Sequence, residues 1–131
     1  MDELVRWLGA QLDEDEYLAK DAIDLPGGDG RWQYVETRGG DHKVIDSLGY
    51  TVTGHYDDDA HPWACEPHIA RHDPARVLRE TDAKRRTLLR CGEEMFSGIP
   101  RLVHFAKQTV REMAAVYEDR PGYEAALAAF E

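Results

Sequence analysis

The sequence has no long apolar run and few cysteines. These two features argue against a membrane protein and against a disulfide-rich protein. No stretch of the 131 residues approaches the roughly 20 consecutive apolar residues of a membrane helix, so we expect no membrane contact. The opening MDELVRWLGAQLDEDE lacks the basic start and apolar core of a secretory signal, which makes the cytoplasm the expected location. The two cysteines, Cys65 and Cys91, are too few for a disulfide framework, and we expect them to be free thiols.

Positive charge is also scarce. The chain has 26 acidic residues against 16 lysines and arginines, a formal net charge of −10. Binding to a phosphate backbone needs a cationic face, so we do not expect a nucleic-acid partner. No serine or cysteine has a convincing base beside it in sequence, and no glycine-rich segment continues into a phosphate-binding loop, so we expect a binding protein rather than an enzyme.

The charge is unevenly distributed along the chain. Residues 1–30 contain nine acids and two bases, whereas residues 65–92 contain seven bases and four acids. We expect the acidic run in the first segment to pair with the basic residues of the second. The alternative is an acidic surface that docks on a protein partner, and its candidate partner-binding residues are Asp13, Glu14, Asp15 and Glu16.

Helical periodicity covers most of the chain, and the length fits a single domain over residues 1–131. The predicted helices are 2–23, about 67–72, 74–90, 100–118 and 123–130. Asp73 and Pro74 form a strong helix start, and Gly92 is the expected end of that helix. The most regular apolar stripe consists of Val103, Ala106, Val110, Met113 and Tyr117. We expect this stripe to lie in the core, although amphipathic helices of this kind could also meet across a homodimer.

Short strands are predicted where glycine concentrates, between residues 27 and 54. The segments RWQYVET, KVIDS and YTVTGH, within 31–55, are joined by tight turns and predict an antiparallel meander. A three-stranded sheet is only marginally stable alone, so it needs a helix on one face. The expected fold class is therefore α+β, a small three-stranded antiparallel meander packed against about four helices.

Histidines gather in the middle of the chain, and they offer a possible metal site. Five of the six lie between residues 42 and 72: His42, His55, His61, His68 and His72. The spacing of His68 and His72 puts two imidazoles on one side of a helical turn, and Cys65 lies three residues before them. Zinc suits such nitrogen and sulfur ligands, with His61 or Cys91 as a fourth. The alternative is a structural role, with His72 beside the Asp73 helix cap.

The central segment HIARHDPARVLRETDAKRRTLL, residues 68–89, resembles a family of short uncharacterised proteins from actinobacteria and their phages. The acidic LDEDE of the first helix, Gly30-Arg31-Trp32 and Pro121-Gly122-Tyr123 are similar to further elements of that family. Because that family has no established activity, the resemblance implies a shared lineage but identifies no catalytic residue in this chain. It favours a small non-catalytic accessory protein of phage or mobile-element type that binds an unidentified protein partner. The alternative is a zinc-binding domain, structural or hydrolytic, that uses His68 and His72.

Overall fold

The computed structural model of the chain describes residues 2–23, 27–55 and 65–130. Its elements follow in the order α1 (Glu3–Asp21), β1 (Trp32–Glu36), β2 (His42–Asp46), β3 (Thr51–His55), α2 (Cys65–Arg71), α3 (Pro74–Met95), α4 (Pro100–Ala115) and α5 (Tyr123–Ala128). The α+β class with a three-stranded antiparallel sheet, predicted from the sequence, is confirmed. None of the helices in the described part of the chain has both the length and the apolar content needed to cross a bilayer.

The chain divides into two compact units. Unit 1 comprises Met1–Asp15 and Thr81–Glu131, and unit 2 comprises Glu16–Glu80. The first part of α1 and the last part of α3 therefore belong to unit 1, and the remaining parts of both helices belong to unit 2. The single domain expected from the chain length stays a prediction.

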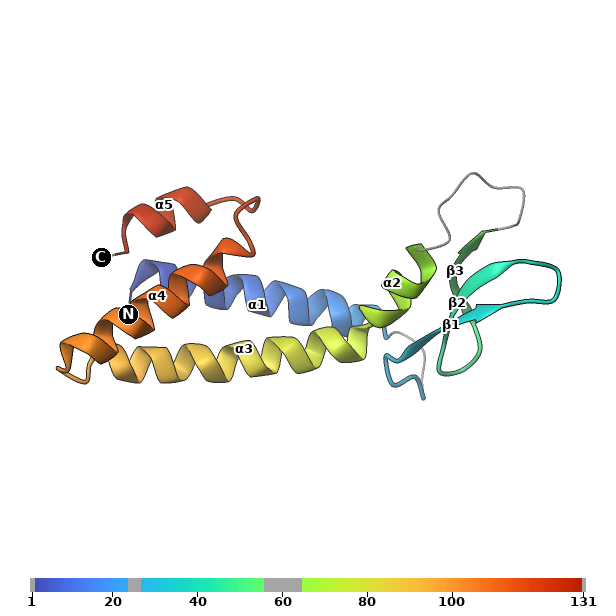
Figure 1. Cartoon of the computed structure of the whole chain (residues 1–131), viewed down its shortest axis with the longest axis horizontal. Helices are drawn as coiled ribbons and strands as arrows, with labels where there is room; N and C mark the ends of the chain where they lie inside the picture. The colour runs from blue at the N-terminus through green and yellow to red at the C-terminus, as the bar shows by residue number, and fades with distance from the viewer. Residues whose placement is uncertain (1, 24–26, 56–64, 131) are drawn as a thin grey trace. The chain divides into compact units, whose positions relative to one another are not determined.

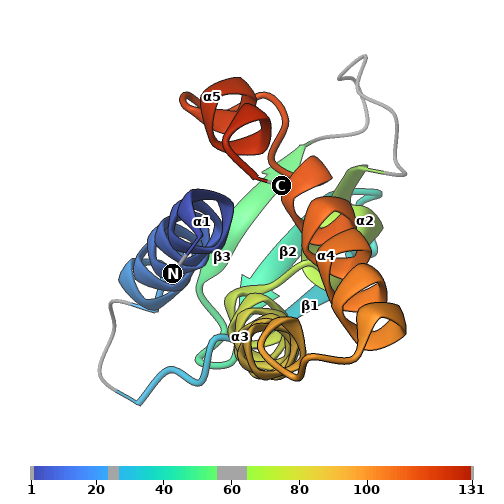
Figure 2. The same cartoon turned by 90° about the vertical axis from the view of Figure 1, so that its left-hand side faces the viewer.

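Unit 1 is a bundle of helices around one apolar core. An end-on view shows α1, α5, α4 and α3 arranged in a ring, with α1 beside α3 (Figure 2). Each helix contributes an apolar stripe to the interior, as the periodicity predicts. The buried core residues are Leu4, Val5, Leu8, Leu12, Leu88, Cys91, Ala106, Val110, Ala114, Tyr117, Ala126 and Phe130. The stripe of α4 thus lies largely in this core, with Met113 packed against its edge.

Helix α3 is longer than the predicted range of 74–90. It begins at Pro74, where the carboxylate of Asp73 accepts a hydrogen bond from the amide of Arg76 at 2.8 Å, a typical N-cap. It continues through Gly92 to Met95. A glycine inside a helix costs about 1 kcal/mol relative to alanine. Burial of Cys91 and packing of Met95 against the core of unit 1 oppose that cost, so the helix does not end at the glycine.

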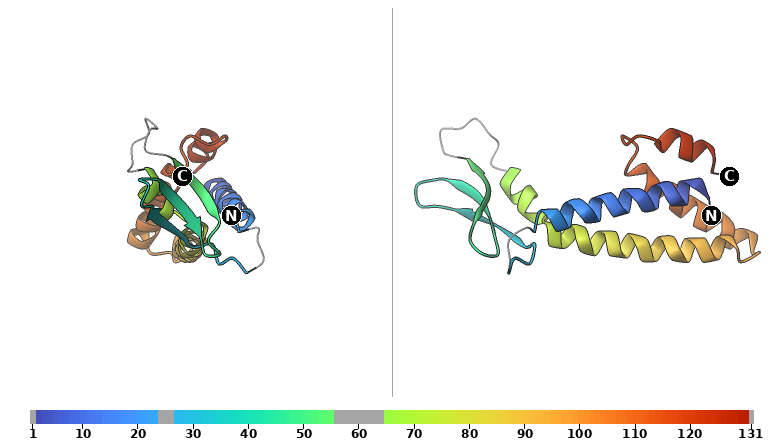
Figure 3. Two further views of the ribbon diagram at one scale, coloured as in Figure 1. Left: turned by 90° about the vertical axis from the view of Figure 1, so that its right-hand side faces the viewer. Right: turned by 180° about the vertical axis from the view of Figure 1, so that it is seen from behind.

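Unit 2 is built on the sheet, whose strands lie in the order β1-β2-β3 with antiparallel pairing throughout (Figure 1). Between β1 and β2 the register pairs Tyr34 with Val44, and the pairing of β2 with β3 has an irregularity between Val44 and Ile45. Helix α2 contacts β1 and β2 and buries Glu66 and Ala70 (Figure 3). The helix supplies the cover that so small a sheet requires.

Candidate protein-binding groove

A groove with a volume of about 740 Å³ lies between α1 and α3 in unit 1. The two helices run side by side in opposite directions, as their chain order shows in Figures 1 and 3. The residues that line the groove are Asp2, Val5, Arg6, Gly9, Ala10, Asp13, Arg85, Leu88, Leu89, Gly92, Glu93, Met95 and Phe96. Most of its exposed lining is apolar, as in sites that bind apolar side chains or ligands.

Small residues on both helices create this hollow. Gly9 lies inside α1 and Gly92 lies inside α3, and each lines the groove. A Cβ atom built on either glycine meets no atom within 4 Å. The missing side chains therefore leave open space rather than allow a close approach of two backbones, so the groove is unfilled by the chain itself.

Large apolar side chains stand exposed beside this hollow. Phe96 is 83% exposed and Leu89 is 69% exposed. Single exposed apolar residues are common on protein surfaces, but an apolar groove flanked by exposed aromatic and aliphatic side chains is typical of an interaction site.

Charged residues of both signs border the groove. Arg85 of α3 donates a hydrogen bond to Asp13 of α1, with 2.7 Å between the nitrogen and oxygen atoms. This ion pair joins the two walls at one end of the groove. Nearer the other end, Arg6 on α1 and Glu93 on α3 are both exposed. Among the described residues neither of these two side chains forms an ion pair.

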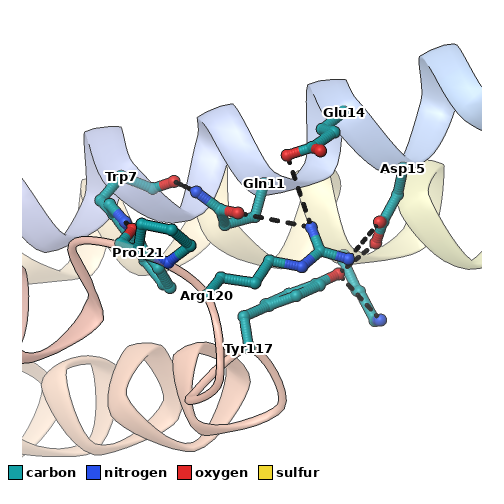
Figure 4. Close-up of polar contacts among 8 residues, drawn as sticks. Trp7, Gln11, Glu14, Asp15, Tyr117, Arg120 and Pro121 are labelled. Carbon is teal, nitrogen blue, oxygen red and sulfur yellow. Dashed lines mark hydrogen bonds and ion pairs between the residues drawn. The ribbon is translucent and has the colours of Figure 1, made fainter.

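The predicted partner-binding run begins at Asp13, and its members have different surroundings. The Arg85 pair joins the acidic and basic helices, as the charge distribution predicted. Asp15 is only 19% exposed in its side chain, and Arg120 donates to it at 2.7 Å (Figure 4). Glu16 pairs with Lys20 one turn later on α1, at 2.8 Å.

Arg120 connects the segment after α4 to α1. Besides Asp15, its guanidinium donates to Gln11 at 3.3 Å and lies 4.0 Å from a carboxylate oxygen of Glu14. It also stacks over the ring of Tyr117, whose hydroxyl donates to Asp15 at 2.8 Å. Burial lowers the pKa of Arg120, but the hydrogen bond and charge of Asp15 outweigh burial, and the net effect raises that pKa.

The acidic run thus makes mostly intramolecular contacts. The Asp15 carboxylate holds Arg120, whereas the side chains of Asp13 and Glu14 are 76% and 62% exposed. Only these two retain much surface for a partner. Two bases of α3 are also used locally, because Arg76 pairs with Glu80 and Arg86 pairs with Asp82, both at 2.7 Å.

The predicted metal ligands Cys65, His68 and His72 lie on or directly after α2. The imidazole rings of His68 and His72 are 4.3 Å apart, and Nδ1 of His72 lies 2.8 Å from the carbonyl oxygen of His68. Cys65 is exposed at the start of the helix. Within residues 2–23, 27–55 and 65–130, no group of three or more histidine, cysteine or acidic side chains is placed to hold a metal ion. The candidate fourth ligand His61 lies outside the described residues, and Cys91 is buried in the core of unit 1.

A second histidine arrangement lies within the sheet of unit 2. His42 is buried, and its Nδ1 lies 2.6 Å from the hydroxyl of Tyr34 on the neighbouring strand. Burial raises the pKa of Tyr34, and the charges of Glu36 and Glu66 raise it further. The phenol therefore stays protonated at neutral pH and can donate to His42. This contact joins β1 and β2 within the sheet.

The sequence patterns do not by themselves predict the groove. Gly92 is the expected end of a helix, although a glycine between the core residue Leu88 and Met95, which packs against the core, is also consistent with a hollow on the outer side of a helix. Gly9 is likewise a glycine inside an amphipathic helix, the first one. Two glycines inside amphipathic helices that pack together are the pattern that could have located it.

Comparison with known proteins gives a family and no activity. The sequence model of a family described as "Family of unknown function (DUF6221)" matches residues 1–128. No curated protein and no solved structure matches the chain significantly. The resemblance to a family of unknown function is therefore confirmed at the level of the family.

Proposed function

The chain belongs to this family of unknown function, and we propose that it acts without catalysis, by binding an apolar helical segment of a protein in the groove between α1 and α3. The observation that carries the proposal is an unfilled apolar groove of about 740 Å³ flanked by exposed Leu89 and Phe96. Grooves of this kind accept apolar side chains spaced along one face of an amphipathic helix. The resemblance drawn from the sequence of the central block, residues 68–89, favours an accessory role in a phage or mobile-element setting, which belongs to the proposal.

The acidic residues next to the groove play a secondary part in this proposal. Asp13 lines the groove and Glu14 follows it, and both carboxylates are largely exposed. They attract a partner whose helix has basic residues beside its apolar face. Asp15 holds Arg120 and belongs to the fold rather than to the surface.

A groove-filled variant tests the proposal. Gly9→Leu places a side chain in the open groove, and since its Cβ meets no atom within 4 Å it should leave the fold intact. Ala115→Leu adds the same side chain at an exposed position of α4 and serves as the matched control. Affinity capture from host cells with three baits should yield a protein that binds the native chain and Ala115→Leu but is lost with Gly9→Leu. Identical captures with all three baits, or no specific capture, would contradict groove binding.

The acidic contribution is tested separately. Asp13→Asn with Glu14→Gln removes both exposed charges and keeps the side-chain shapes. We expect weaker capture that loses most of its dependence on salt, because long-range attraction between exposed charges is screened at moderate ionic strength. Unchanged capture and unchanged salt dependence would remove the acidic run from the interface.

Zinc binding through His68 and His72 is the second candidate, and the 4.3 Å separation of their rings is the observation that favours it. His68 lies on α2 and His72 directly after it, and Cys65 is three residues before His68. Elemental analysis of protein purified without a nickel column measures bound zinc directly. About one equivalent, lost in His68→Ala and accompanied by a lower melting temperature, would support this site. Less than half an equivalent, with melting unchanged by a chelator, would remove it.

A further inference from the structure

The walls of the groove in unit 1 carry a repeated pattern that specifies the segment it holds. We infer that the occupant is a cationic amphipathic helix of about three turns, with two large apolar side chains three or four positions apart that enter recesses over Gly9 and Gly92. This inference rests on the proposed function of the groove and names the chemistry of the partner. Its basis is the spacing of the wall residues, the open space at the two glycines, and the charges beside them.

The wall on α1 is a single stripe of residues. Asp2, Arg6, Gly9 and Asp13 all line the groove, and they follow one another at steps of four, three and four residues. Such steps keep side chains on one side of a helix. The stripe therefore has larger side chains on either side of a gap at Gly9, where a Cβ would meet no atom within 4 Å.

The wall on α3 repeats the same arrangement. Arg85, Leu89, Gly92 and Phe96 line the groove at the same steps of four, three and four residues. Here the gap lies at Gly92, and a Cβ on that residue also meets nothing within 4 Å. Each wall of the groove thus has one recess.

The two recesses are offset along the groove by one step of a helix. Helices α1 and α3 run in opposite directions, and the contact between Asp13 and Arg85 sets a common level on the two walls. From that level Gly9 is four residues away and Gly92 is seven, in the same direction along the groove. At 1.5 Å per residue the recesses are about 4.5 Å apart, on opposite walls. Side chains three or four positions apart on one face of a helix are separated by about 4.5–6 Å along its axis, which matches this offset.

The extent of the two stripes gives the length of the occupant. Asp2 lies eleven residues before Asp13, and Phe96 lies eleven residues after Arg85. Both walls therefore extend for about 16 Å, which is the length of about three helical turns. Phe96, 83% exposed, stands at the far end of the α3 wall and can cover the end of such a helix.

Acidic side chains prevail in the lining of the groove. Asp2, Asp13 and Glu93 line it, against Arg6 and Arg85, and Arg85 is already bonded to Asp13. In a chain with a net charge of −10, this lining attracts a helix whose flanks are basic. Arg6 opposes such a helix, so its charge reduces the affinity rather than supplying it.

Fluorescence anisotropy with synthetic peptides tests the spacing of the anchors. The probe is a labelled, lysine-flanked peptide of about 15 residues whose leucines recur three and four positions apart on one face. A peptide of the same composition, with its leucines spread around the helix, is the control. The native protein and Ala115→Leu should bind the first peptide at least about tenfold more tightly than the second. Equal affinities for the two peptides, or no binding of the first, would overturn the inference.

Filling each recess separately tests whether both are used. Gly9→Leu and Gly92→Leu should each weaken binding of the amphipathic peptide at least about tenfold, because each blocks one anchor. Gly92→Ala adds a smaller side chain and should weaken binding less than Gly92→Leu. Circular dichroism melting of each variant separates a blocked recess from a loss of folding. A peptide that binds Gly92→Leu as tightly as the native protein would show that the second recess is not used.

Charge reversal tests the cationic character of the occupant. Arg6→Glu removes the opposing charge and should tighten binding of the lysine-flanked peptide severalfold, whereas Glu93→Lys should weaken it by a similar factor. Affinities that neither reversal changes would overturn this part of the inference.

The inference and the proposed function fail in different ways. Capture of a partner that Gly9→Leu loses but Gly92→Leu retains supports the proposed function and overturns the two-recess occupant. Loss of both the partner and the amphipathic peptide in each leucine variant supports both. Capture and peptide binding that are unchanged in Gly9→Leu and Gly92→Leu overturn both.

Discussion

Replacement of Arg120 by alanine should destabilise unit 1 by about 2 kcal/mol. The guanidinium donates to the poorly exposed Asp15 at 2.7 Å, and a hydrogen bond to a charged group contributes roughly 1.5–3 kcal/mol. Its stacking on Tyr117, 4.5 Å from the ring centre, adds roughly 0.5–1 kcal/mol. Because 29% of the Arg120 side chain is exposed, water recovers part of this loss, which reduces the expected total.

Urea unfolding followed by circular dichroism measures this effect, and a second ion pair supplies the control. Arg86 and Asp82 are also 2.7 Å apart, but their side chains are 67% and 63% exposed. Arg86→Ala should therefore change the free energy of unfolding by less than about 0.5 kcal/mol. A double-mutant cycle of Arg120→Ala with Asp15→Ala should give a coupling energy of about 1–2 kcal/mol. Equal losses for Arg120→Ala and Arg86→Ala would refute the view that partial burial makes the Arg120 contact stronger.

Three further substitutions test local features by the same unfolding assay. Asp73→Ala removes the cap of α3 and the acceptor of the Trp32 amide at 3.1 Å, so we expect a loss of about 1–2 kcal/mol, and a loss below 0.5 kcal/mol would contradict the capping role. Gly30→Ala should lose more than about 1 kcal/mol, because φ is +78° and the new Cβ would lie 2.6 Å from Ile23; a more stable protein would show that this turn adapts freely. Leu8→Ala should lose about 2–5 kcal/mol because Leu8 is fully buried, and a neutral result would mean that unit 1 does not pack around α1.

The fold class was predictable because the sequence patterns it depends on are local. The stripe on α1 with Leu8 and Leu12, and the stripe on α4 with Val110, repeat at helical spacing, and all three residues are fully buried. The three strands are short segments separated by glycine-containing turns, which predict a meander without long-range information. The Asp73 cap was equally visible, since the residues it serves follow it directly.

Contacts between distant segments were only partly predictable. The overall charge asymmetry indicated that acidic and basic helices pair, and Asp13 does bond Arg85. The charge asymmetry did not indicate the contact between Arg120 and Asp15. Arg120 lies 105 residues from Asp15, in a turn with no periodic pattern. The extension of α3 past Gly92 and the groove beside it depend on packing between helices. The apolar pattern of one helix alone therefore predicts neither the end of α3 nor the groove.

The division of the chain has a consequence for how the protein can be shortened. Unit 2 is one continuous segment, Glu16–Glu80, inserted between the two halves of unit 1. Within unit 1, Tyr117 hydrogen-bonds both Asp15 and Lys84, so the two cut ends are held near one another by a common neighbour. A short linker in place of the insert would leave a helical miniprotein that retains the complete groove, whereas truncation from either terminus would remove part of the bundle.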